Sequence, residues 1–128
     1  MSEDPAARPH LPRAAPIEAY GKGGFRFAQL SHRGSLLCLP VGIWASPITT
    51  PAEITDEALA LVFANATLID HCLIGTGVDM VPLAVSLREK FRANQIVVEA
   101  MTTGAAVRTY NILLGERRRV AALLIAVP

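Results

Sequence analysis

Apolar and polar side chains alternate from about residue 25, where Phe25 and Phe27 flank a charged position. A period of two residues is typical of a half-buried β-strand. A polar turn at residues 32–34 and a second apolar run, Ser35–Leu39, follow, and Gly42–Ala45 is predicted to be a further extended piece. The pattern predicts an N-terminal β hairpin whose second strand is Ser35–Leu39.

From residue 55 onward the apolar spacing becomes helical, and the helical segments alternate with short apolar strands. Thr55 is a suitable N-cap for the first of these helices, and Gly115 is a suitable stop for the last. The predicted order is a helix over 55–66, a strand over 69–75, a helix over 82–93, a strand over 96–101, a helix over 103–114 and a last strand that ends near residue 127. The strand, helix and strand between residues 69 and 101 form a βαβ unit.

Strands that alternate with helices indicate a parallel sheet, because each parallel connection crosses one face of the sheet and covers it. We predict an α/β fold with three layers: a mixed, mostly parallel central sheet, helices on both faces, and the added N-terminal β hairpin. Residues 17–128 are predicted to be a single domain, since a chain of 128 residues suits one hydrophobic core. Residues 1–16 carry four prolines and are predicted to be a disordered leader.

Charge and cysteine content argue against several functions. The 12 Lys and Arg nearly balance the 11 Asp and Glu, so the net charge is +1 and no strong basic field attracts nucleic acid. Cys38 and Cys72 are far apart, without the spacing typical of zinc sites or thiol exchange, and are expected to be core residues. The longest apolar run, 120–128, is far below the about 20 residues that cross a bilayer. We expect a cytoplasmic protein with no transmembrane segment.

The two loops that leave the carboxyl ends of the strands over 69–75 and 96–101 form the first candidate site. Neighbouring parallel strands place such loops side by side, where open α/β sheets commonly bind a ligand. Small residues permit close backbone approach, threonine hydroxyls can donate, and a helix start favours an anion. The alternative is that Thr102 or Thr103 only caps the helix while the glycines allow a tight turn. The predicted crevice residues are Gly75, Thr76, Gly77, Thr102, Thr103 and Gly104.

Arg108 and Asn111 are predicted to continue this crevice along the helix. They are three positions apart and therefore share a helix face. They either contribute to ligand binding or belong to a buried hydrogen-bond network. In a buried network the charge of Arg108 needs a partner, for which Glu99 on the preceding strand is the candidate.

Motifs for nucleotide binding and catalysis are missing from the sequence. Met80 stands where a dinucleotide fingerprint needs its third glycine, and no Gly-Lys-Ser/Thr follows Gly77. His71 and Cys72 are neighbours on a predicted strand, so their side chains point to opposite faces and do not form a nucleophile and base pair. We predict no catalytic residue, no metal and no cofactor.

Three joined segments resemble a known family over roughly residues 20–127. The family is a widespread domain of unknown function that includes a mitochondrial respiratory complex I assembly factor and an adipogenesis-associated vertebrate protein. The resemblance implies a three-layer α/β fold with a mixed central sheet and an added β element. The segments are Leu73 to Gly77, Val98 to Ala106, and Arg108 to Asn111.

The resemblance also bears on function, because the family has no settled enzymatic activity and its mitochondrial members act in protein assembly. It implies a noncatalytic accessory or assembly protein that works through a protein partner, with transfer of the role by analogy. The alternative from the residues is a binding protein or enzyme for a small anionic ligand at the predicted crevice. Homo-oligomer formation stays open.

Overall fold

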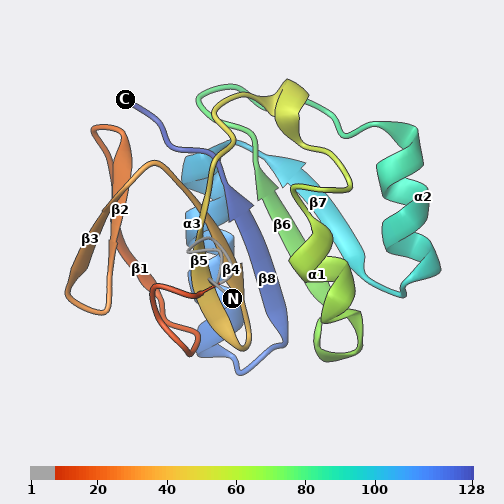
Figure 1. The fold of residues 1–128 in the computed structure, drawn as a ribbon, viewed down its shortest axis with the longest axis horizontal. Helices are drawn as coiled ribbons and strands as arrows, with labels where there is room; N and C mark the ends of the chain where they lie inside the picture. The colour runs from red at the N-terminus through yellow and green to blue at the C-terminus, as the bar shows by residue number, and fades with distance from the viewer. Residues whose placement is uncertain (1–7) are drawn as a thin grey trace, which may run out of the picture.

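The computed structural model describes residues 8–128 and shows a five-stranded central sheet (Figure 1). Its strand order is β5-β4-β8-β6-β7. The sheet is mixed, as predicted: β6 runs parallel to both β7 and β8, whereas β4 runs antiparallel to β5 and to β8. The strands are β4 (Ser35–Leu39), β5 (Gly42–Ser46), β6 (His71–Gly75), β7 (Val97–Met101) and β8 (Val120–Leu124).

Helices cover both faces of this sheet, which confirms the predicted three layers. In Figure 1, α1 (Ala60–Ala64) lies in front of the sheet, and α3 (Thr103–Gly115) lies behind it. α2 (Val85–Ala93), at the right beyond β7, packs into the same core as α1. Alternation along the strands supplies two separate cores. Leu37 and Ile74 face the α1 and α2 side, whereas Leu36 and Leu73 face the α3 side. Two short 3-10 helices, η2 (Pro51–Glu53) and η3 (Ala66–Leu68), flank α1.

The N-terminal β element is a three-stranded antiparallel sheet that packs on the α3 side of the molecule. Its order is β1-β2-β3, and the register is Phe25 opposite His32 and Phe27 opposite Leu30. Ile17 and Phe27 are buried beside α3. The strands are β1 (Ile17–Gly21), β2 (Gly24–Phe27) and β3 (Leu30–Arg33).

The predicted partner of the first hairpin strand is wrong. β2 turns at Ala28 and Gln29, whose φ values of 47° and 65° lie in the left-handed region, and pairs with β3. Ser35–Leu39 pairs with β5 and β8 in the central sheet instead, and every one of its residues is buried. Burial on both faces is the property of an inner strand, so this run belongs at the centre of a sheet.

The helical segments follow the prediction with shifted ends. The segment from Thr55 begins with turns, in which Ala58 N donates to Thr55 Oγ1 (3.3 Å), and becomes α-helical only at Ala60. The predicted helix over 82–93 starts at Val85, and the predicted helix over 103–114 extends to Gly115. The βαβ unit of β6, α2 and β7 is therefore confirmed.

The segment before β1 contacts the central sheet. His10 N donates to Ile43 O (2.8 Å) and Ile43 N donates to Leu11 O (2.9 Å), which adds a bridge beside β5. Ala15 is buried in the core on the α3 side. The first seven residues of the predicted leader lie outside the described residues, and the division at residue 17 stays a prediction.

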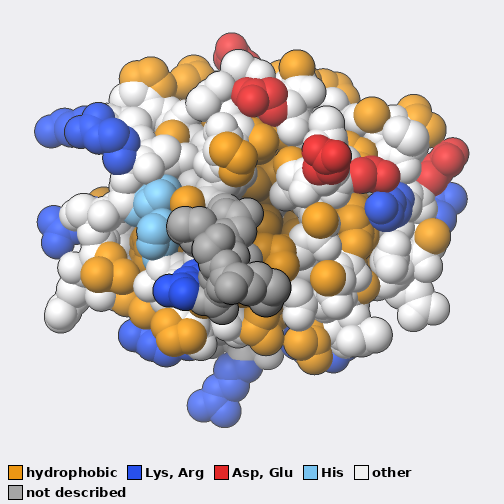
Figure 2. All heavy atoms as spheres, in the orientation of Figure 1, with side chains coloured by type: hydrophobic (Ala, Val, Ile, Leu, Met, Phe, Trp, Pro, Cys, Tyr) orange, Lys and Arg blue, Asp and Glu red, His pale blue; other side chains and the backbone are white. Residues whose placement is uncertain are grey.

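Figure 2 shows where the charged side chains lie on one face of the molecule. On this face the acidic side chains gather across the upper half, and most of the basic side chains lie at the margins. Within residues 8–128, no helix combines the length and the apolar character needed to span a bilayer. The same residues contain no group of three or more His, Cys, Asp or Glu side chains placed to hold a metal ion.

Candidate functional site

The two predicted loops lie side by side at the carboxyl ends of β6 and β7. β6 and β7 are parallel neighbours, and Gly75 is opposite Met101 in their register. Beyond the strands, Thr76 N donates to Met101 O (2.8 Å) and Thr103 N donates to Gly77 O (2.9 Å). The backbone itself therefore joins the loop after β6 to the start of α3.

Thr103 fills the space between the loops. Its side chain is fully buried, its hydroxyl donates to Ile125 O (2.7 Å) and it accepts from Gly77 N (3.0 Å). A Cβ built on Gly75 would lie 2.9 Å from Thr103 Cα, so only glycine allows this approach. The Thr103 hydroxyl therefore joins three segments of the protein: the start of α3, the loop after β6 and the segment after β8.

Thr76 has a similar role within its own loop. It is buried, its hydroxyl donates to Asp79 O (2.6 Å), and it accepts from Val81 N (3.0 Å). Gly77 has a φ of 107°, a conformation that favours glycine, and it lets the chain turn directly after Thr76. These contacts hold the loop from residue 76 to residue 81 in one shape.

Thr102 is the N-cap of α3. Its backbone is extended, and its side-chain oxygen accepts from Ala105 N (3.3 Å). A Cβ on Gly104 would lie 2.5 Å from Tyr20 Oη, so this glycine lets β1 approach the first turn of the helix. Thr102 therefore caps the helix, as the structural alternative for this residue expects. The Tyr20 side chain lies beside Gly104 at the start of the same helix.

Asn111 joins α3 to the N-terminal sheet. Its Oδ1 accepts from Ile17 N (2.8 Å) and its Nδ2 donates to Ile17 O (2.8 Å), so one amide satisfies both backbone groups of a β1 residue. The hydroxyl of the preceding residue, Tyr110, donates to Ala15 O (3.1 Å). Asn111 is thus already engaged in holding β1 against α3.

Arg108 is exposed, contrary to a buried network. Glu99 is also exposed, and the predicted pair between them is not among the ion pairs that residues 8–128 form. Arg108 and Asn111 are brought together with Gly104 in a surface groove of about 410 Å³ between α3 and β1. The predicted site residues therefore divide into a buried joint around Thr76 and Thr103 and an open groove around Arg108.

The buried ionisable groups do not supply a nucleophile. Burial raises the pKa of the Cys38 thiol to about 12, and burial likewise raises the pKa of the Cys72 thiol. Burial also raises the pKa of the Tyr110 hydroxyl. All three groups stay protonated near neutral pH, and both cysteines are core residues, as predicted.

The sequence prediction missed an exposed apolar loop between β6 and α2. Val78 is 68% exposed and Met80 is 54% exposed, and Val81 and the first residue of α2, Val85, are exposed as well. Leu83, by contrast, packs against the core on the α1 and α2 side. The available signal was the run Val78-Asp79-Met80-Val81-Pro82, whose apolar residues follow neither a strand nor a helix period.

This fold and these loops match a family model described as a protein of unknown function (DUF498/DUF598), over residues 17–125. The chain belongs to this family. The predicted resemblance is therefore confirmed, including its link to a complex I assembly factor, since relatives of that name match the chain.

Three matches show the breadth of the similarity. A crystal structure described as that of an outer membrane protein from Bartonella henselae is 50% identical in sequence and has a TM-score of 0.90. The match covers 93% of this chain and 100% of that chain. An uncharacterized protein of Rhodobacter capsulatus is 38% identical over 94% of this chain and 91% of its own length. NADH dehydrogenase [ubiquinone] 1 alpha subcomplex assembly factor 3 of Danio rerio is 30% identical over 88% of this chain, which spans 64% of that protein.

Proposed function

We propose that this protein is a noncatalytic accessory protein that acts in assembly by binding a partner protein. The observation that carries the proposal is the exposed apolar loop of Val78, Met80 and Val81, which continues into Val85 at the start of α2. Exposed apolar side chains that gather in one region are typical of protein-binding surfaces. The name of the Danio rerio relative, an assembly factor, supports the same class of function.

The shape of this loop suits a preformed binding surface. Thr76 holds its first half through Asp79 and Val81, and Leu83 anchors its second half on the core. A loop that is already ordered loses little conformational entropy when a partner binds. Its exposed side chains are therefore available for burial at small entropic cost.

The proposal is tested by affinity purification of the full chain from its native cells. We expect Met80→Glu to reduce recovery of a defined partner by about tenfold, because a buried carboxylate opposes an apolar contact. Ile112→Glu is the matched control, since Ile112 is 55% exposed and Met80 is 54% exposed. Equal recovery by both variants would contradict a role for the loop.

A second candidate function is binding of a small anionic ligand in the groove between α3 and β1. Arg108 supports this candidate, because it is exposed, lines the groove with Gly104, and has no ion pair among the described residues. Calorimetric titration with inorganic phosphate tests it. Binding that Arg108→Ala abolishes would favour this function, and no heat at millimolar phosphate would remove it.

The proposed location is the cytoplasm. Cell fractionation of the full chain is expected to place it with the cytoplasmic proteins. Recovery in a membrane fraction that persists after a high-salt wash would contradict this location.

A further inference from the structure

β7 is the last strand of the central sheet and has β6 as its neighbour on one side. Val97 N donates to Asp70 O (2.9 Å), and Met101 O accepts from Thr76 N (2.8 Å), so both residues direct backbone groups toward β6. Successive residues of a parallel strand direct these groups to opposite sides. The backbone N–H and C=O groups of Val98 and Ala100 therefore point away from β6, along an open edge.

This edge is regular. The pairing of β6 with β7 runs from Val97 to Met101 without a bulge. Val97 is 59% exposed, and the strand contains neither proline nor lysine, two residues that commonly protect an edge from further pairing. Its one charged residue, Glu99, is exposed and alternates with Val98, so its carboxylate lies on the face opposite to α2. The edge can therefore accept another extended segment.

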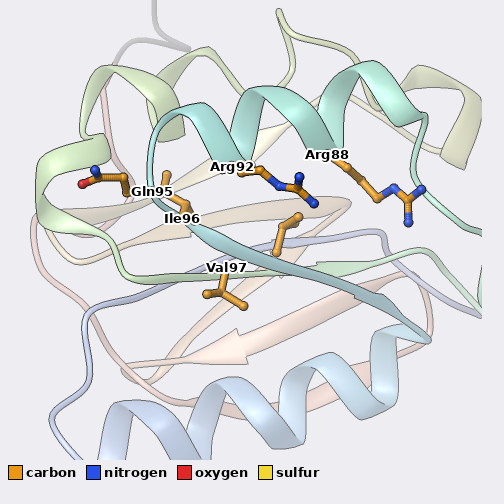
Figure 3. A pocket seen from close by; sticks show the side chains of 6 residues that line it. Arg88, Arg92, Gln95, Ile96 and Val97 are labelled. Atoms are coloured by element: carbon orange, nitrogen blue, oxygen red, sulfur yellow. The ribbon is translucent and has the colours of Figure 1, made fainter.

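Two arginines of α2 lie beside the edge. Arg88 and Arg92 are one helical turn apart, and in Figure 3 both side chains extend from α2 on the side of β7. With Gln95 and Ile96 they line a cavity of about 420 Å³ that continues onto β7. The ion pairs within residues 8–128 involve Lys90, Arg118 and Arg119, so Arg88 and Arg92 are left without a carboxylate partner.

Arg92 lies in the last turn of α2, where the helix dipole favours a positive charge, whereas Arg88 lies outside that turn. Like charges at positions i and i+4 repel each other and slightly destabilise a helix. An anionic partner that binds beside β7 would reverse this effect, because each guanidinium would then face a carboxylate. The two positive charges therefore favour a partner that carries negative charge.

The same charges argue against a second copy of this chain as the occupant. Two β7 strands joined antiparallel about a twofold axis form one continuous sheet, and both α2 helices then lie on the same face of it. Arg88 and Arg92 of each copy would lie on either side of the seam, which places four positive charges together. An occupant with negative charge avoids this repulsion.

We propose that the open edge of β7 and the Arg88 and Arg92 pair bind an extended acidic segment of a partner protein, which adds a sixth strand to the central sheet. The inference rests on the proposed accessory function and names the chemistry of its partner. The spacing is suitable: residues i and i+4 are about 6 Å apart along a helix. Alternate side chains of a strand are about 7 Å apart, so successive carboxylates on one face can reach the two arginines.

The test is an NMR titration of the full chain with the peptide acetyl-Glu-Val-Glu-Val-Glu-Val-amide. The amide signals of Val98 and Ala100 are expected to shift most, because their N–H groups form the new hydrogen bonds. A second peptide with Lys in place of Glu is expected to bind about tenfold more weakly, because its charges repel the arginines.

Two variants separate the backbone contribution from the charge contribution. Ala100→Pro removes an outward N–H and leaves the ladder to β6 in place, so it should abolish peptide binding, whereas Ala100→Ser keeps the donor and should bind normally. Arg88→Glu combined with Arg92→Glu should reverse the preference between the two peptides. Arg117→Glu combined with Arg118→Glu makes the same charge change elsewhere and should leave the preference unchanged. The amide spectrum of each variant reports whether it is folded.

Three results would overturn the inference: equal affinity for both peptides, no shift at Val98 and Ala100 at millimolar peptide, or a dimer in sedimentation that Ala100→Pro dissociates. These results are distinct from failure of the proposed function. Absence of peptide binding together with partner recovery that depends on Met80 removes the edge site alone. Peptide binding together with partner recovery that is insensitive to Met80→Glu removes the loop contact alone.

Discussion

The rim of the central sheet contains two neighbouring regions with opposite properties. The polar joint of Thr76 and Thr103 is buried, and both hydroxyls are used inside the protein. The apolar loop that begins one residue after Gly77 is exposed, with Val78 and Met80 at the surface. The comparison shows that residue type alone does not identify a binding surface: here the hydroxyls stabilise the fold, and apolar side chains face solvent.

The largest effect on the joint is expected from Thr103→Val. This change leaves Gly77 N and Ile125 O buried without their partner, so the free energy of unfolding should fall by about 3 kcal/mol in urea denaturation. Thr103→Ser keeps the hydroxyl and should restore about half of the loss. Equal losses for the two variants would show that the hydroxyl does not hold the joint.

Gly75→Ala tests the close approach between β6 and α3. The added methyl group would meet the backbone of Thr103, so we expect a loss of about 2 kcal/mol in the free energy of unfolding. Gly115→Ala is the matched control, because a Cβ there has no atom within 4 Å, and it should not destabilise the protein. If Gly75→Ala left the free energy of unfolding unchanged, the contact between β6 and α3 would have to adapt to the added methyl group.

Thr102→Ala should have a smaller effect than either change in the joint. It removes the bond from Ala105 N, and loss of an N-cap typically lowers the free energy of unfolding by about 1 kcal/mol. Urea denaturation of Thr102→Ala and Thr103→Val in the same buffer compares the two losses in the free energy of unfolding. A loss as large as that of Thr103→Val would place Thr102 within the joint itself.

Arg108→Ala should have the smallest effect on stability. The side chain is exposed and has no ion pair among the described residues, so the free energy of unfolding should change by less than about 0.5 kcal/mol. A large loss would mean that Arg108 supports the contact between α3 and β1. Denaturation with and without phosphate measures this change and any anion effect together.

Much of the fold was predictable from local patterns. The segments of β6, α2, β7 and α3 have strong periodicity, and their alternation gives the layered sheet. The turn between β2 and β3 was missed because Ala28 and Gln29 adopt positive φ values without the glycine or asparagine that usually marks such a turn. Alternation alone therefore places Ser35–Leu39 in the N-terminal sheet, whereas the strand pairs in the central sheet.

The position of the candidate site was predictable, but the use of its residues was not. Parallel order places the two loops together, as the contact between Thr76 and Met101 shows. The partner of Asn111, however, is Ile17, which is 94 residues away in the sequence. The acceptor for Thr103 is Ile125, 22 residues away. Contacts of this range depend on the complete fold, so the sequence alone left ligand binding and internal bonding as alternatives.

The most direct test of this account compares Met80→Glu with Thr103→Val, with partner recovery measured per folded molecule. The account predicts that Met80→Glu unfolds at the wild-type urea concentration and loses most of its partner, whereas Thr103→Val unfolds earlier and keeps its partner when folded. The opposite pattern, with partner binding lost only in Thr103→Val, would contradict the assignment of structure to the joint and of binding to the loop.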